Sequence, residues 1–101
     1  MYTSRLKSPQ TDLLAKALLS LSDEEECYRF MEDLLTVREI RDLSQRLEVA
    51  MLLKDKVTYN EIVEKTGVST ATIGRVNRSL TYGAGGYEVV IKRIAKEDRD
   101  D

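Results

Sequence analysis

Three short segments of this chain carry the capping box, a signature of helix starts. Each places a serine or threonine three residues before a glutamate, in Ser22–Glu25, Thr36–Glu39 and Thr58–Glu61. The hydroxyl accepts a hydrogen bond from the backbone N–H three residues on, and the glutamate accepts one from the backbone N–H of the cap. Each signature precedes an amphipathic run, and the single proline, Pro9, lies before all three. The chain is therefore expected to be all-α, without strands.

Apolar residues at spacings of three and four outline six helices. The expected helices cover residues 9–21, 23–35, 37–54, 59–66, 70–81 and 86–96. Glycine favours the position just beyond a helix, so Gly67 is expected to end the fourth, and Ser69 is expected to cap the fifth. The leucine-rich faces of the first two helices are interpreted mainly as core, with a part left for a dimer interface. Residues 97–101 carry no apolar side chain and are expected to fray.

A chain of 101 residues is expected to form a single domain. A chain of this size that is split into short helices often completes its core by dimerising. Residues 9–54 are expected to supply the core and dimerisation helices, residues 58–81 a helix-turn-helix, and residues 86–96 a C-terminal helix. There is no run of about 18 apolar residues and no signal-peptide pattern, so no membrane span is expected. With one cysteine, these features indicate a cytoplasmic location.

The sequence lacks the residues that several kinds of catalytic, metal and phosphate-binding site require. The chain contains no histidine or tryptophan, and Cys27 therefore has no histidine to activate it. Neither a metal site nor a cofactor is expected, because carboxylates alone would have to build the site. The segment Gly83–Gly86 lacks the lysine and the preceding strand of a phosphate-binding loop, and is interpreted as a flexible connector. An enzyme is not expected.

Positive charge is concentrated in one part of the chain. The net charge is −2, and residues 22–34 hold six acidic residues against one arginine. Residues 65–82, in contrast, hold three cations and no anion. The helix over residues 70–81 therefore presents small, hydroxylated and arginine side chains, a combination that suits contact with a polyanion.

Residues 58–81 contain the parts of a DNA-binding helix-turn-helix. The turn is expected at Gly67, and the apolar anchors are expected to be Ile62, Val63, Val68, Ile73 and Val76. Arginine can pair with guanine, and alanine and threonine methyl groups can meet the methyl group of thymine. The residues expected to contact DNA are Tyr59, Asn60, Ser69, Thr70, Ala71, Thr72, Gly74, Arg75 and Arg78. The alternative for this segment is an ordinary helical hairpin packed in a core.

Gly74 lies inside the expected recognition helix, where glycine is about 1 kcal/mol less favourable than alanine. One interpretation is that the backbone approaches DNA closely at this position. The other is that the helix is loose until it binds. The second interpretation is preferred on the sequence alone.

From Leu35 to Leu80 the chain resembles the tryptophan repressor (TrpR) superfamily. The resemblance rests on Leu35, Thr36, Glu39, Leu43, Arg46, Leu52, Leu53, Glu61, Gly67, Ala71, Thr72, Ile73, Arg75, Ser79 and Leu80. The segments Cys27–Phe30, Gln45–Ala50 and Leu80–Gly83 are similar to the TrpR-related YerC/YecD group of bacterial proteins. The resemblance implies a six-helix fold and an intertwined homodimer whose recognition helices enter successive major grooves of a pseudo-palindromic operator. The implied function is a sequence-specific DNA-binding transcription regulator, a repressor; the alternative is a helical dimeric protein-interaction module.

The resemblance also implies an effector site. In tryptophan-responsive members the indole lies between two arginines that match Arg46 and Arg75, and helix-end carbonyls near Thr36 and a serine matching Ser79 take the amino group. Those members have glycine directly after the second arginine, where this chain has Val76, so tryptophan is not expected to bind. Another small effector, or none, stays open. Without an effector, Arg46 is expected to pair with Glu39 or Asp42, and Arg75 to contact DNA.

Overall fold

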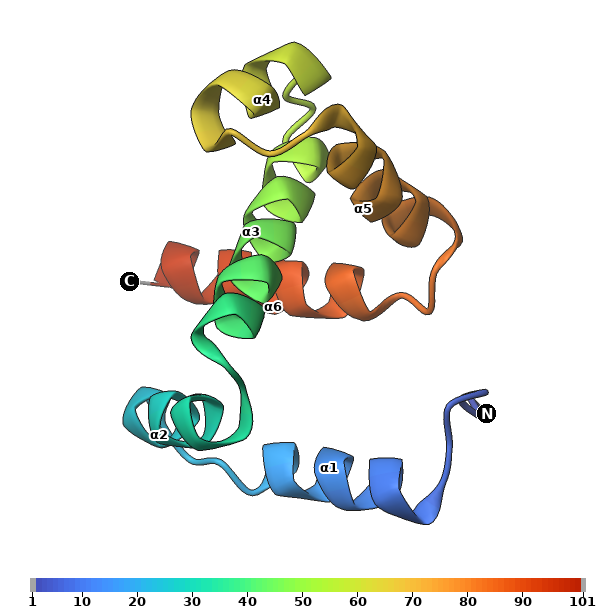
Figure 1. Cartoon of the computed structure of the whole chain (residues 1–101), viewed down its shortest axis with the longest axis vertical. Coiled ribbons are helices and arrows are strands. Elements are labelled where there is room, and N and C mark those ends of the chain that lie inside the picture. The colour runs from blue at the N-terminus through green and yellow to red at the C-terminus, as the bar shows by residue number, and fades with distance from the viewer. Residues whose placement is uncertain (1, 101) are drawn as a thin grey trace. The chain divides into compact units, whose positions relative to one another are not determined.

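The computed structural model describes the backbone of residues 2–100 and the side chains of residues 2–97. Within that range the chain forms helices without strands, which confirms the all-helical prediction (Figure 1). The helices are α1 (Pro9–Leu19), α2 (Glu24–Leu34), α3 (Val37–Lys54), α4 (Tyr59–Thr66), α5 (Thr70–Tyr82) and α6 (Gly86–Asp100).

The bounds of α3 and α4 are those predicted; α2 is one residue shorter at each end, α5 ends one residue later, and α1 and α6 end elsewhere. Helix α1 stops at Leu19 because Ser20 caps its end, with Ser20 Oγ donating to the carbonyl oxygen of Ala17 at 2.6 Å. Helix α6 continues beyond residue 96 to Asp100, since no glycine or proline interrupts it there. Fraying of residues 97–101 stays a prediction, and Asp101 lies outside the described residues.

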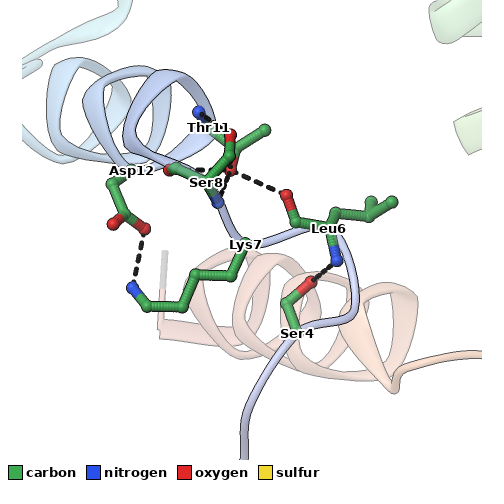
Figure 2. A network of polar contacts seen from close by, with 6 residues as sticks. All are labelled: Ser4, Leu6, Lys7, Ser8, Thr11 and Asp12. Atoms are coloured by element: carbon green, nitrogen blue, oxygen red, sulfur yellow. Dashed lines mark hydrogen bonds and ion pairs between the residues drawn. The ribbon is translucent and has the colours of Figure 1, made fainter.

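Helix α1 begins at a capping box formed by Ser8 and Thr11 (Figure 2). The backbone N–H of Thr11 donates to Ser8 Oγ at 3.1 Å, and the backbone N–H of Ser8 donates to Thr11 Oγ1 at 2.8 Å. Thr11 Oγ1 also donates to the carbonyl oxygen of Leu6 at 2.8 Å, and Lys7 forms an ion pair with Asp12 at 2.8 Å. These contacts hold the segment before α1 against its first turn. This cap does not match the serine-to-glutamate signature, because threonine takes the place of the usual glutamate.

The cap of α2 differs from the predicted one by a single position. The cap is Asp23, whose carboxylate accepts from the backbone N–H of Glu26 at 2.9 Å. The backbone N–H of Ser22 donates to the Glu26 carboxylate at 2.8 Å, a role that the predicted box gave to Glu25. The predicted caps of α4 and α5, Thr58 and Ser69, are confirmed. The box predicted at Thr36 stays a prediction.

The chain divides into two compact units, Met1–Val37 and Arg38–Asp101. The N-terminal unit contains α1 and α2, and neither helix has a buried side chain. Within the single chain Leu18 is 53% exposed and Leu34 is 50% exposed, so the interpretation of these leucine faces as core stays a prediction. Two short helices offer each other too little apolar surface to cover both faces.

Every buried side chain among the described residues lies in the C-terminal unit. They come from α3, α4, the turn after α4, and α5, and they are Val49, Ala50, Ile62, Val68, Ile73 and Val76. In Figure 1, α4 lies at the C-terminal end of α3, and the chain then returns through α5 and α6. Half-buried side chains of α6, Tyr87 and Ile91, pack against the cluster. The predicted anchors are confirmed as buried, except that Val63 is half-buried at the edge.

Gly67 turns the chain between α4 and α5. Its φ is +72°, in the left-handed region, and its N–H donates to the carbonyl oxygen of Val63 at 2.8 Å. Thr66 completes the turn: its hydroxyl donates to the carbonyl oxygen of Ile62 at 2.7 Å and accepts from the N–H of Val68 at 3.1 Å. The predicted role of Gly67 is confirmed. The hydrogen bonds of the Thr66 side chain also stabilise the turn, which the glycine alone did not predict.

Lys56 makes the corresponding turn after α3, although it is not a glycine. Its φ is 62°, and its N–H donates to the carbonyl oxygen of Leu53 at 3.0 Å. The N–H of Val57 donates to the carbonyl oxygen of Leu52, also at 3.0 Å, which completes a Schellman motif. A residue with a Cβ is strained by about 1–2 kcal/mol in this conformation.

Substitutions at these two turns should change stability in opposite directions. Gly67→Ala should lower the free energy of unfolding by about 1 kcal/mol or more, because a Cβ is disfavoured at positive φ even where no atom lies nearby. Lys56→Gly should raise it by about 1 kcal/mol by relieving the same strain. Equilibrium urea unfolding followed by circular dichroism measures both. Changes of the same sign would contradict this account of the turns.

Candidate nucleic-acid interface

The rotation of α5 is set by its buried side. Ile73 is fully buried and Val76 is 4% exposed, and both belong to the core cluster. At helical spacing, the opposite side then carries Ala71, Gly74 and Arg78. Ala71 and Arg78 are exposed, as the sequence predicts for residues that contact DNA.

The start of α5 presents polar groups to solvent. Ser69 and Thr70 are exposed, and Ser69 Oγ accepts from the backbone N–H of Thr72 at 3.2 Å. Ser69 Oγ also donates to Thr72 Oγ1 at 3.1 Å. Thr72 is half-buried, so its side chain belongs to the side of α5 near α3 rather than to the exposed face. The exposed start carries free backbone N–H groups, which favour an anion at this end of the helix.

Tyr59 and Asn60 lie in the first turn of α4 and are both exposed. Helix α4 has eight residues and is about 12 Å long, so its first turn lies at the opposite end of the helix from the Gly67 turn that leads into α5. The structure thus places the predicted DNA contacts in two groups, one at the start of α4 and one along α5.

Unpaired cations accompany these groups. Among the described residues, Lys56, Lys65, Arg75 and Arg78 form no ion pair. Lys54 differs, because its Nζ lies 3.2 Å from a carboxylate oxygen of Glu88 and joins α3 to α6. The cations near α4 and α5 are therefore available to an external anion.

Arg46 of α3 and Arg75 of α5 border two adjoining hollows in the C-terminal unit. The first, about 260 Å³, is lined by Arg46, Thr72, Arg75, Val76, Ser79 and Tyr87. The second, about 340 Å³, is lined by Asp42, Gln45, Arg46, Gly67, Val68, Ser69, Thr72 and Arg75. The two arginines are exposed and thus lie on the solvent side of both hollows. Arg78 borders neither of them.

The structure does not contain the predicted ion pair of Arg46. Asp42 borders the same hollow, yet Arg46 pairs with neither Asp42 nor Glu39 among the described residues. Both Arg46 and Asp42 extend into water, where pairing gains little free energy. The arginine therefore keeps its full set of donors for other groups.

Three of the predicted effector residues meet at the smaller hollow, namely Arg46, Arg75 and Ser79. The fourth, Thr36, belongs to the N-terminal unit and is not among the lining residues. Val76 is both a core anchor and part of the wall of this hollow.

Sequence reasoning missed Tyr87, which borders this hollow from α6. Tyr87 lies four residues before Ile91, and this spacing would have placed it on the packed face of α6.

Among the described residues, no helix has the length and apolar character needed to cross a membrane.

Comparison with known proteins identifies the family. The model of the Trp repressor protein family matches residues 9–95. The uncharacterized protein YerC of Bacillus subtilis (strain 168) is 46% identical over 100 residues, covering 99% of this chain and 96% of YerC. A TrpR-like protein from Eubacterium eligens ATCC 27750 is 53% identical, with a TM-score of 0.85 over 90% of this chain and 94% of that one. A candidate Trp repressor from Staphylococcus aureus is 46% identical, with a TM-score of 0.85 over 90% and 91% of the two chains. The chain therefore belongs to the Trp repressor protein family and is YerC-like.

Proposed function

We propose that this protein is a DNA-binding transcription regulator that acts as a homodimer in the cytoplasm and catalyses no reaction. One observation carries the proposal: the exposed side of α5 holds unpaired arginines and small residues, without an acidic side chain in the helix. Membership of a repressor family supports a regulatory role.

In this proposal α4, the turn at Gly67 and α5 act as a helix-turn-helix. Helix α5 enters the major groove, where Arg78 pairs with a guanine and the start of the helix meets a phosphate. The first turn of α4 meets a phosphate of the DNA backbone. The proposed contacts are Tyr59, Asn60, Ser69, Thr70, Ala71, Gly74, Arg75 and Arg78, with the half-buried Thr72 at their edge.

The apolar faces of the N-terminal unit support the homodimer. Leu13, Leu19 and Val37 are strongly exposed, with Leu19 at 87%, and α1 and α2 have no buried residue. Such a surface is stable in water when a second copy covers it. A two-fold dimer presents two copies of α5, which suits a pseudo-palindromic operator and repression by occlusion.

The lining of the smaller hollow indicates which kind of effector would fit there. Its unpaired arginines and Ser79 suit an anionic or polar group, while Val76 and Tyr87 occupy part of its wall. A wall with a branched side chain leaves less room for a flat ring between the arginines. We therefore expect no response to tryptophan; the alternative occupant of the hollow is a small polar or anionic effector held by Arg46, Arg75 and Ser79.

A protein-interaction module is the second candidate function. The first turn of α2 carries Glu24, Glu25 and Glu26, all exposed, and could dock a basic partner. Absence of duplex DNA binding at low salt, together with capture of a defined protein partner, would favour this candidate.

Arginines on the exposed side of α5 should contribute to DNA binding. Binding to duplex DNA should weaken steeply between about 50 and 200 mM salt, because phosphate contacts release counterions. Arg78→Ala should lower affinity for the preferred duplex about tenfold or more, and affinity for random duplexes less. Fluorescence anisotropy measures both, with Arg29→Ala, an exposed arginine of the N-terminal unit, as the matched control. Equal losses of affinity for all duplexes would show that Arg78 contacts only a phosphate.

Charges placed on the apolar surface of α1 should disrupt the dimer. Sedimentation of the wild-type protein should give the mass of two chains, and Leu13→Glu with Leu19→Glu should shift it toward one, because a carboxylate is costly to bury. Lys65→Glu, on the exposed side of α4, is the control and should leave the mass unchanged. A stable folded wild-type monomer would contradict the homodimer.

Calorimetry with L-tryptophan should give no saturable heat for the wild-type protein. Val76→Gly removes the side chain from the wall of the hollow and should increase any binding, provided that circular dichroism shows a folded variant. Clear saturable binding by the wild-type protein would show that Val76 leaves the site open.

A further inference from the structure

Gly74 lies inside α5 at a position where no contact within the chain requires glycine. A Cβ built on Gly74 would meet no atom within 4 Å, and its φ lies outside the left-handed region. Glycine at an interior position of a helix is about 1 kcal/mol less favourable than alanine. The folded chain by itself would thus be more stable with alanine, so the reason for glycine lies outside the chain.

A loose helix does not explain this glycine well, although the sequence alone favoured that interpretation. Helix α5 is continuous from Thr70 to Tyr82 and is capped by Ser69. Ile73 and Val76 flank Gly74 in sequence, and both are buried in the core cluster. Packing on both sides of the glycine holds the helix in place before any partner binds.

The surroundings of Gly74 indicate what lies against it. At helical spacing, Ala71 precedes it by three residues and Arg78 follows it by four, and both are exposed. The missing Cβ therefore leaves an open position, the notch, on the side of α5 that carries Ala71 and Arg78. In the major groove, the apolar group that projects from the base pairs is the C5-methyl group of thymine.

We propose that the notch at Gly74 receives the C5-methyl group of a thymine and so determines the base at one position of the bound sequence. This inference rests on the proposed DNA binding. Arg78, one helical turn further on, is then placed to pair with a base next to that thymine. Any side chain at position 74 would occupy the space that the methyl group needs.

The test compares Gly74→Ala with the wild-type protein on a duplex that the wild-type protein selects from a randomised pool. Each thymine of that duplex is replaced in turn by uracil, which lacks the C5-methyl group. For the wild-type protein, one replacement in each half-site should weaken binding about fourfold, the value of one buried methyl group. Gly74→Ala should bind the thymine duplex tenfold or more weakly, and a duplex with uracil at the matching position of both half-sites should restore most of that loss.

Thermal unfolding shows that the variant is folded, and its melting temperature should be equal or higher. Asn77→Ala, an exposed position at the edge of α5, is the matched control and should show no interaction with the thymine-to-uracil replacement. Binding by Gly74→Ala that equals or exceeds wild type would overturn the notch and support a loose helix. A loss that is equal on thymine and uracil duplexes would also overturn it. Absence of duplex binding by the wild-type protein would overturn the proposed function and the notch together.

Discussion

The burial of Ile73 and Val76 against α3 and α4 is the contact on which the remaining site depends. It fixes the rotation of α5 about its own axis, so the same packing that stabilises the C-terminal unit decides which side chains face outward. A rotation by one residue would bring Gly74 toward the core and turn a buried branched side chain into water. The exposed arginines are thus positioned by apolar packing, since they have no ion pair or hydrogen bond of their own among the described residues.

The two units differ in how their stability arises. The C-terminal unit has a buried cluster to which three helices and a turn contribute, and its turns at Lys56 and Gly67 are closed by backbone hydrogen bonds. The N-terminal unit relies on local capping contacts of exposed side chains, each of which contributes little in water. In the proposed homodimer, this unit gains its core from a second copy. Folding and assembly would then be one process for α1 and α2, while the surface that carries α5 is formed by packing within one chain.

Local signals in the sequence predicted the helices well, because caps and spacing depend on residues only a few positions apart. They placed α3 and α4 and identified Thr58, Gly67 and Ser69. They chose the wrong residue at α2, where Asp23 rather than Ser22 accepts from the first turn and the backbone N–H of Ser22 donates to Glu26. The burial of the side chains of α1 and α2 could not be predicted, since it depends on which other helices or chains pack over them. The position of Tyr87 beside Arg46 and Arg75 depends on the path of α6 and was missed for the same reason.

Arg75 and Arg78 share a helix and a charge, but their surroundings separate their roles. Arg75 borders both hollows together with Arg46, so two unpaired guanidinium groups lie around one space and raise its attraction for any anion. Arg78 borders neither hollow and lies beside Gly74 on the outward side. A phosphate or effector that bound between Arg46 and Arg75 would therefore occupy Arg75 and leave Arg78 free for a base. In such an arrangement, anion binding at the hollow and base contact at the notch can occur together, because they draw on different side chains of the same rigidly packed helix.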